Sequence, residues 1–215
     1  MKILIQVYYF MRSLILRGPY NTYKLAKAEF EHEKLLGLNT ASFKRSESTE
    51  YFHYQGASYL ILLRIFRDLE PKTKHFQFID IGSGKGRAVF VAEYCGYEKV
   101  TGIELDPELV EEANKNKKQY KLRTKNAIIQ FSQANALIYP FKNEPSLYFL
   151  FNPFNEEVLQ KVLENILKIN RSELWLIYMN PLYTGPFDKA GLKPIKTFKS
   201  GFYTEALVYK RDKLN

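Results

Sequence analysis

The stretch Phe78-Ile79-Asp80-Ile81-Gly82-Ser83-Gly84-Lys85-Gly86-Arg87 decides the fold of this chain. Its apolar run ends in an acid and enters a Gly-x-Gly-x-Gly turn, a pattern that predicts a β-strand, a tight loop and the start of a helix. Glycine is needed where the backbone takes a positive φ or approaches a ligand closely, and the N-terminus of the following helix presents free N–H groups. The pattern therefore predicts a loop that grips a nucleotide-like cofactor.

A second apolar run, Val100-Thr101-Gly102-Ile103-Glu104, also ends in an acid. Its distance from the first run is close to the spacing of about 20 residues at which a ribose-binding carboxylate is expected. Together the two runs predict a βαβ nucleoside site with Asp80 and Glu104 in it. Two alternatives stay open: Asp80 is a capping or turn acid, and Glu104 is an N-terminal partner of the next helix.

The glycine spacing indicates which cofactor the loop holds. A dinucleotide-binding loop reads Gly-x-Gly-x-x-Gly, and a P-loop reads Gly-x-x-x-x-Gly-Lys-Ser/Thr; neither pattern occurs here. Asp80 stands two residues before the first glycine, where a carboxylate disfavours a pyrophosphate but suits a cation or an ammonium group. S-adenosylmethionine carries both of these positive groups.

On these residues the chain resembles the class I S-adenosylmethionine-dependent methyltransferases, from about Tyr51 to the C-terminus. The resemblance implies an α/β fold: a doubly wound, mostly parallel seven-stranded sheet, the Rossmann-like methyltransferase fold, with an N-terminal helical extension. We expect the extension at residues 1–50 and the methyltransferase domain at 51–215. No internal repeat or low-complexity segment is present.

The resemblance also implies roles for the two acids and the loop. The loop is expected to pass under the methionine part of the cofactor, with Asp80 binding its amino group and Glu104 its two ribose hydroxyls. The neighbouring residues expected to contact the cofactor are Gly82, Ser83, Gly84, Gly86, Arg87 and Leu105.

A third strand is predicted at 127–131, and Asn135-Ala136 follows it, where the family usually has an acid and a small residue near adenine. An Asn amide can both donate and accept, so it can pair with the adenine edge. The alternative is that Asn135 closes a turn of its own loop.

The run Leu147–Phe151 is apolar throughout, as expected of a central strand that is covered on both faces, and Asn152-Pro153-Phe154 follows it. This triplet resembles a shortened Asn-Pro-Pro-Tyr/Phe signature of amino-nitrogen methyltransferases, and a similar arrangement is found in the non-SET protein-lysine methyltransferases. The resemblance implies that the Asn oxygen and the Pro carbonyl accept hydrogen bonds from the target amine while the ring lies beside it. The alternative is that Asn152 caps the helix predicted at 156–169, although Asn155 is the better cap, and that Phe154 belongs to the core.

Tyr54 and Gln55 are expected to begin the helix before the first strand and to close the cofactor site. The segment Tyr51–Tyr59 resembles a Tyr-rich segment ahead of the first motif in a bacterial methyltransferase group. Because the chain has 16 tyrosines, simple packing is the alternative for this segment.

The remaining patterns predict further elements. Asp106 and Pro107 are typical of an N-cap and a first helical residue, and predict a helix to about Tyr120. Other strands are predicted at 173–179, 194–199 and 204–210, the last two as an antiparallel hairpin.

The first 17 residues predict an amphipathic helix. One side carries the apolar stripe Leu4, Val7, Tyr8, Met11, Leu14 and Ile15, and the opposite side carries Lys2, Gln6, Ser13 and Arg17. The helix is too short and too charged to span a bilayer and lacks a signal-peptide cleavage site. Its stripe either lies in a membrane plane or packs on the sheet domain or a second subunit. Another helix is predicted at 21–36, and 39–49 is expected to be a mobile connection over the cofactor cleft.

The composition limits the partners. The net charge of +9 and the isoelectric point near 9.4 favour an acidic partner such as nucleic acid, although the densest basic run, at 115–125, also suits a solvated helix end. Cys95 is the only cysteine, and the three histidines show no metal-ligand spacing. We therefore expect a cytoplasmic protein without a disulfide or a bound metal.

The leading hypothesis is an enzyme that transfers a methyl group from S-adenosylmethionine to a nitrogen of a macromolecule, protein lysine ahead of a nucleic-acid base. A non-catalytic scaffold that keeps the nucleoside pocket is the second hypothesis. A nicotinamide oxidoreductase would need the other glycine spacing.

Overall fold

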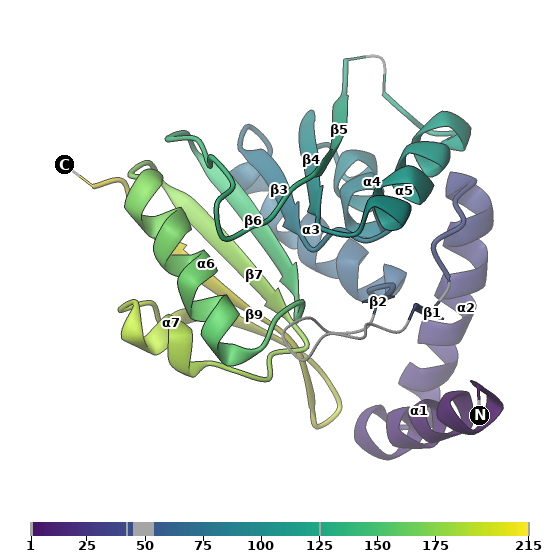
Figure 1. The fold of residues 1–215 in the computed structure, drawn as a ribbon. Coiled ribbons are helices and arrows are strands. Elements are labelled where there is room, and N and C mark those ends of the chain that lie inside the picture. Colours follow the sequence, from purple (N-terminus) through teal and green to yellow (C-terminus); the bar gives the residue numbers. More distant parts are fainter. Residues whose placement is uncertain (1, 42, 45–53, 125, 215) are drawn as a thin grey trace.

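The computed structural model describes residues 2–41, 43–44, 54–124 and 126–214, and for residues 2–9, 43–44 and 54–55 it describes the backbone alone. Figure 1 shows a central sheet with helices on both faces and two N-terminal helices to one side. None of the helices in these ranges is long and apolar enough to cross a membrane.

Seven strands form the central sheet in the order β5-β4-β3-β6-β7-β9-β8. Neighbours among β3 to β7 run parallel, and β9 runs antiparallel to both β7 and β8. The strands are β3 (Gln77–Ile81), β4 (Lys99–Glu104), β5 (Ile128–Gln133), β6 (Ser146–Phe151), β7 (Leu174–Met179), β8 (Pro194–Ser200) and β9 (Tyr203–Arg211). The predicted seven-stranded, mostly parallel sheet with a closing hairpin is confirmed.

Two cores cover the two faces of the sheet. Side chains alternate between faces along each strand, so Leu147 and Phe149 of β6 enter one core while Tyr148 and Leu150 enter the other. The first core includes α3 (Tyr59–Thr73) and α4 (Arg87–Tyr94), and the second includes α6 (Glu156–Ile169) and α7 (Gly185–Lys189). Because β6 and β7 are covered on both sides, almost every residue in them is buried.

Local sequence explains where the helices begin. Asp106 caps α5 (Pro107–Gln119) by accepting a hydrogen bond from the Glu108 backbone N–H, and Pro107 occupies the first turn. Asn155 caps α6 in the same manner, accepting from Val158 N–H. Both caps are the residues that the sequence predicts.

The N-terminal extension consists of α1 (Lys2–Arg17) and α2 (Pro19–Leu36), and Gly37 ends α2 in the left-handed conformation. Leu36 and Leu38 are buried in the core shared with α3 and α4. The extension is therefore packed against the sheet part of the molecule, and a domain boundary near residue 50 stays a prediction.

One expectation about the segment between α2 and α3 is wrong. Tyr54–Gln55 form the short strand β2, which pairs with β1 (Phe43–Lys44), and α3 begins only at Tyr59. At the start of the predicted mobile connection, the backbone N–H groups of Asn39 and Thr40 bind Asn116 and Glu33, and the mobility of the connection stays a prediction. The rest of the predicted connection, at 45–49, lies outside the described residues.

Candidate active site

The strand order reverses at β3, whose neighbours β4 and β6 lead away in opposite directions. In open α/β sheets such a switch point leaves a crevice at the carboxyl ends of the strands, where ligands bind. The loop after β3 and the loop after β6 meet there: a Cβ placed on Gly82 would lie 2.7 Å from Cβ of Pro153. The structure thus brings the glycine loop against the Asn-Pro-Phe triplet.

The glycine loop is a rigid turn. Gly82, Gly84 and Gly86 have φ values of 77°, 52° and 86°, which side chains rarely tolerate. The N–H groups of Gly82 and Ser83 both donate to the Ile103 carbonyl oxygen, at 2.8 and 3.0 Å. The loop is therefore tied to β4, the strand that ends in the second acid.

Ser83 carries a buried hydroxyl inside this loop. Its Oγ has no hydrogen-bond partner among the described residues. Gly102 of β4 leaves room for it, since a Cβ at that position would lie 2.6 Å from Oγ. An unsatisfied buried hydroxyl costs free energy, so it indicates a place that a polar ligand atom can fill.

Asp80 is a second buried polar side chain, and it too has no hydrogen-bond partner among the described residues. Its side chain is 3% exposed, and no hydrogen bond to its carboxylate is found in the described part of the chain. Burial raises the pKa of Asp80 well above the usual range, and the nearby charge of Glu104 raises it further. A cationic ligand group beside Asp80 would relieve both effects.

Glu104 binds the backbone around it. One carboxylate oxygen accepts from Gly84 N–H at 2.8 Å, and the other accepts from Leu105 N–H at 2.8 Å and Asp106 N–H at 3.0 Å. Burial raises the pKa of Glu104, and these three hydrogen bonds act in the opposite direction. A carboxylate has about four hydrogen-bond acceptor sites. Because three backbone N–H groups already bind Glu104, about one acceptor site is left for a ligand hydroxyl.

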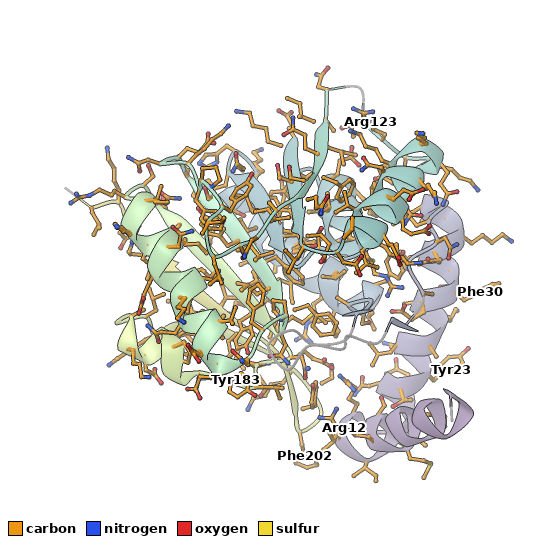
Figure 2. The ribbon with its side chains drawn as sticks, viewed as in Figure 1. Arg12, Tyr23, Phe30, Arg123, Tyr183 and Phe202 are labelled. Carbon is orange, nitrogen blue, oxygen red and sulfur yellow. The ribbon has the colours of Figure 1, made fainter. Side chains whose placement is uncertain are left out.

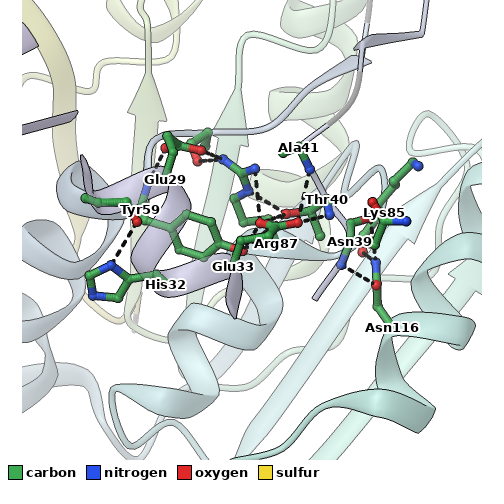
Figure 3. A network of polar contacts seen from close by, with 12 residues as sticks. Glu29, His32, Glu33, Asn39, Thr40, Ala41, Tyr59, Lys85, Arg87 and Asn116 are labelled. Atoms are coloured by element: carbon green, nitrogen blue, oxygen red, sulfur yellow. Dashed lines mark hydrogen bonds and ion pairs between the residues drawn. The ribbon is translucent and has the colours of Figure 1, made fainter. Parts of the chain in front are cut away.

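Arg87 begins α4, but its side chain points to the N-terminal extension (Figure 3). Its guanidinium donates to Glu29 at 2.6 Å and lies 3.4 Å from Glu33, both on α2. It also donates to Thr40 Oγ1 at 2.7 Å and lies 4.3 Å from the centre of the Tyr59 ring. The Arg87 side chain therefore joins the loop helix to α2, and a cofactor contact by this residue stays a prediction.

Three further predicted cofactor residues flank the two acids. Asn135 closes its own turn, because its Oδ1 accepts from Leu137 N–H at 2.9 Å, while its amide nitrogen stays available as a donor. Ala136 is buried in the core of the α6 face, and Leu105 is exposed beside Glu104. The structure is compatible with a contact between the cofactor and Asn135 or Leu105. Ala136 packs in the core beneath the loop.

Asn152 is held in an unusual conformation at the end of β6. Its φ is 43°, in the left-handed region that Asn tolerates better than most residues. Its Oδ1 accepts a hydrogen bond of 2.8 Å from the Tyr178 hydroxyl, which in turn accepts from the N–H groups of Leu182 and Tyr183. Tyr178 therefore orients the amide, and no pattern in the sequence indicated this contact.

The other two residues of the triplet have different surroundings. Pro153 lies against Gly82, whereas Phe154 is 5% exposed and packs in the core with α6. Asn155 caps α6, so the alternative that Asn152 is the cap is wrong. The alternative that Phe154 belongs to the core is confirmed. The side chains of Tyr54 and Gln55 lie outside the described residues.

Residues 78–172 match the family model of a methyltransferase domain. This match confirms the prediction of a methyltransferase and includes the glycine loop, both acids and Asn152. No curated protein sequence matches the chain. Membership of the group that resembles the non-SET lysine enzymes stays a prediction.

Two solved structures illustrate the shared fold. Magnesium protoporphyrin IX methyltransferase from Synechocystis PCC 6803 has a TM-score of 0.53 and 14% identity, over 71% of this chain and 77% of its own. Ribosomal protein L11 methylase from Lactobacillus delbrueckii subsp. bulgaricus has a TM-score of 0.50 and 13% identity, over 73% of this chain and 79% of its own. At such identities the likeness shows the fold alone, and it agrees with the predicted methyltransferase fold.

Several features of this methyltransferase fall outside the matched range. The helices α1 and α2, with Glu29 and Glu33 that bind Arg87, lie before residue 78, and Tyr178 lies after residue 172. The spacing of Glu29 and Glu33, one helical turn apart, is the one sequence signal that could have indicated a cation binding to α2.

Proposed function

We propose that this enzyme methylates a nitrogen of a macromolecular acceptor, with protein lysine favoured, and that it uses S-adenosylmethionine as the methyl donor. The observation that carries the proposal is that Asp80, buried and without a hydrogen-bond partner among the described residues, and Asn152 come from the neighbouring strands β3 and β6 at the switch point of the sheet.

The residues around the glycine loop fit the donor. Asp80 would accept from the donor's amino group, because a buried carboxylate to which no described residue donates gains most from a cation. Ser83 Oγ would gain its missing hydrogen bond, and Glu104 would accept from a ribose hydroxyl with its remaining acceptor site. The Synechocystis relative in the comparison holds S-adenosylmethionine, which supports the same ligand here.

Asn152 supports a nitrogen acceptor. The Tyr178 hydroxyl occupies one lone pair of its side-chain oxygen and leaves the second for an N–H of the incoming amine. Burial raises the pKa of Tyr178, so its hydroxyl stays protonated and remains a donor to Asn152. We therefore infer that Tyr178 orients the amide and does not remove a proton from the acceptor.

The position of Phe154 favours an aliphatic amine over a nucleic-acid base. A planar base is usually held by stacking on an exposed aromatic ring, but this ring is buried in the core. A lysine amine needs only the acceptor oxygen and a path to the methyl group. The relatives named above act on a ribosomal protein and on a porphyrin, so the preference for lysine rests on these contacts.

Methyl transfer mainly requires the protein to align the acceptor amine with the methyl group of the donor. Held by Asp80, Ser83 and Glu104, the donor would supply an electrophilic methyl carbon to a neutral amine, and the electron pair of the broken S–C bond would remain on its sulfur. The Asn152 oxygen would hold the amine with its lone pair toward that carbon, and the loops after β3 and β6 would keep water away. The lysine ammonium must lose its proton before the transfer, and we assign that proton to solvent.

The test is a transfer assay with S-adenosylmethionine carrying a tritiated methyl group. The acceptors are a nuclease-treated bacterial lysate and, separately, protease-treated nucleic acid from the same lysate. We expect label in protein, released as methyl-lysine after acid hydrolysis. Label in nucleic acid alone would assign the base alternative, and binding of the donor without any transfer would favour the scaffold.

Two neighbouring asparagines provide a matched pair of variants. Asn152→Ala should reduce transfer strongly while donor binding is retained. Asn155→Ala removes only the cap of α6, costs about 1 kcal/mol of unfolding free energy and should leave transfer close to normal. Equal activity of the two variants would refute the role given to Asn152.

A further inference from the structure

The helix α1 is attached to the protein through its polar side. Arg17 forms two hydrogen bonds, of 2.6 and 2.9 Å, with the buried carboxylate of Glu205 on β9. The same guanidinium lies 4.1 Å from the centre of the Tyr203 ring, and Arg12 lies 5.6 Å from it. Ser13 bonds Thr22 of α2 at 2.9 Å. In an ordinary surface helix the polar side is exposed to solvent, whereas in α1 it binds the protein.

Two residues of the apolar stripe of α1 face outward. Ile15 is 74% exposed and Met11, one turn earlier, is 49% exposed, although both belong to the apolar stripe of the sequence. Phe10 is exposed beside them. The expectation that this stripe packs on the sheet domain is therefore not met by these residues.

A hairpin tip extends the same surface. Phe202, between β8 and β9, is 94% exposed, and its N–H donates to the Leu16 carbonyl oxygen at 3.1 Å. Figure 2 shows Phe202 at the extremity of the molecule beside α1, with Arg12 next to it. An exposed aromatic ring at a tip, joined to an exposed aliphatic stripe, marks an interaction surface.

The first part of the chain carries positive charges and no negative ones. Residues 1–28 contain five lysines and arginines and no aspartate or glutamate. The first acid of the chain, Glu29, is turned inward to Arg87. Lys24 is exposed near Tyr20, which is exposed as well. A second copy of the chain would bring the same positive charge, whereas an anionic lipid surface complements it.

We propose that α1 and the β8–β9 tip form a membrane-docking surface for a bilayer that contains anionic lipids. A helix of 16 residues is about 24 Å long, so it suits a position in the plane of the interface better than a span of about 30 Å. Met11, Ile15 and Phe202 enter the boundary between headgroups and acyl chains, and exposed Lys24 contacts a lipid phosphate. Because β8 runs parallel to β7, the tip lies at the carboxyl edge of the sheet. The surface is thus at the same edge as the glycine loop.

The proposal is tested by flotation of the full-length protein with vesicles of phosphatidylcholine alone and of phosphatidylcholine with phosphatidylglycerol. We expect binding to the mixed vesicles, weak binding to the neutral ones, and a decrease when the salt concentration is raised. The double variant Met11→Asp/Ile15→Asp should lower the vesicle affinity about tenfold or more, because two charges replace the inserted side chains. The control Ile128→Asp changes a half-exposed residue on the opposite edge strand, β5, and should bind like the wild type.

Two outcomes would overturn the proposal. Absence of binding to the anionic vesicles refutes it, and so does binding that the double variant retains while its circular dichroism spectrum is native. A dimer in sedimentation equilibrium that the double variant abolishes, together with no vesicle binding, would assign the surface to a second copy.

Discussion

Replacing Asp80 by Asn should stabilise the free protein and weaken its binding of S-adenosylmethionine. The carboxylate is almost completely buried, and no described residue donates a hydrogen bond to it. The amide has nearly the same shape but carries no charge, so it removes the cost of burying one. The two expected effects have opposite signs, which few other substitutions would produce.

The effect on stability follows from the raised pKa of Asp80. In the folded protein the carboxyl keeps its proton at a higher pH than in the unfolded chain. The free energy of unfolding of the wild type therefore falls as pH rises from the ordinary carboxyl pKa to the raised one. Below that window the variant and the wild type should be equally stable, and above it the variant should be more stable.

The size of both effects can be bounded. Each unit by which the pKa is raised corresponds to about 1.4 kcal/mol, and 1 kcal/mol changes the Tm of a chain of this size by about 2–4 °C. The Tm of the variant should therefore exceed that of the wild type above the pH window. Loss of a hydrogen bond to a charged group costs about 1.5–3 kcal/mol, which weakens the Kd about 10- to 150-fold.

Calorimetry measures both quantities: scanning calorimetry from about pH 4 to 8 gives the stability, and isothermal titration with S-adenosylmethionine gives the Kd. Asp188→Asn, on the exposed surface of α7, is the matched control and should change neither. An Asp80→Asn protein that unfolds at a lower temperature would mean that the carboxylate has a stabilising partner. A variant that binds the cofactor like the wild type would refute the site.

Three further results are expected. Tyr178→Phe should lower kcat about tenfold and leave the cofactor Kd unchanged, because the hydroxyl orients Asn152; an unchanged kcat in a steady-state assay would contradict this. Arg87→Ala should cost about 3 kcal/mol of unfolding free energy in urea, since it leaves Glu29 and Glu33 without their cation, and a loss below about 1 kcal/mol would refute the network. The affinity for S-adenosylmethionine should rise with pH, because the amino group of the ligand lowers the pKa of Asp80 and binding therefore releases a proton. Titration in buffers of different ionisation enthalpy measures the number of protons released. Proton uptake on binding, or no proton exchange, would contradict this prediction.

The sequence predicted the sheet and the helix caps because these depend on local signals. The apolar runs of β3, β6 and β7 and the caps Asp106 and Asn155 are each encoded within a few neighbouring residues. The glycine spacing likewise fixed the loop, since three positive φ values leave little choice of residue.

Contacts between distant segments could not be predicted in this way. Arg17 and Glu205 lie 188 positions apart, and their ion pair decides which side of α1 faces the protein. The amphipathic pattern indicates that α1 has an apolar and a polar side, but it does not indicate that the polar side binds the rest of the protein. Tyr54 and Gln55 were placed in a helix because the helical pattern of α3 begins just after them, whereas pairing with Phe43 and Lys44 makes them a strand.

The candidate site was only partly predictable for the same reason. Asp80, Glu104 and Asn152 end neighbouring strands, and strand ends meet at one edge of a parallel sheet. The three N–H groups that occupy Glu104 and the tyrosine that orients Asn152 depend on the folded backbone. The spacing of the motifs therefore located the acids but did not reveal how many of their hydrogen-bond acceptor sites are available to a ligand.

The most direct test of the account is isothermal titration of the wild-type protein with S-adenosylmethionine and S-adenosylhomocysteine, with NAD as the control ligand. The account predicts that the first two bind one per chain and that NAD gives no heat of binding. Binding of NAD, or no binding of any of the three, would contradict the assignment of the glycine loop, Asp80 and Glu104 to a methyl donor.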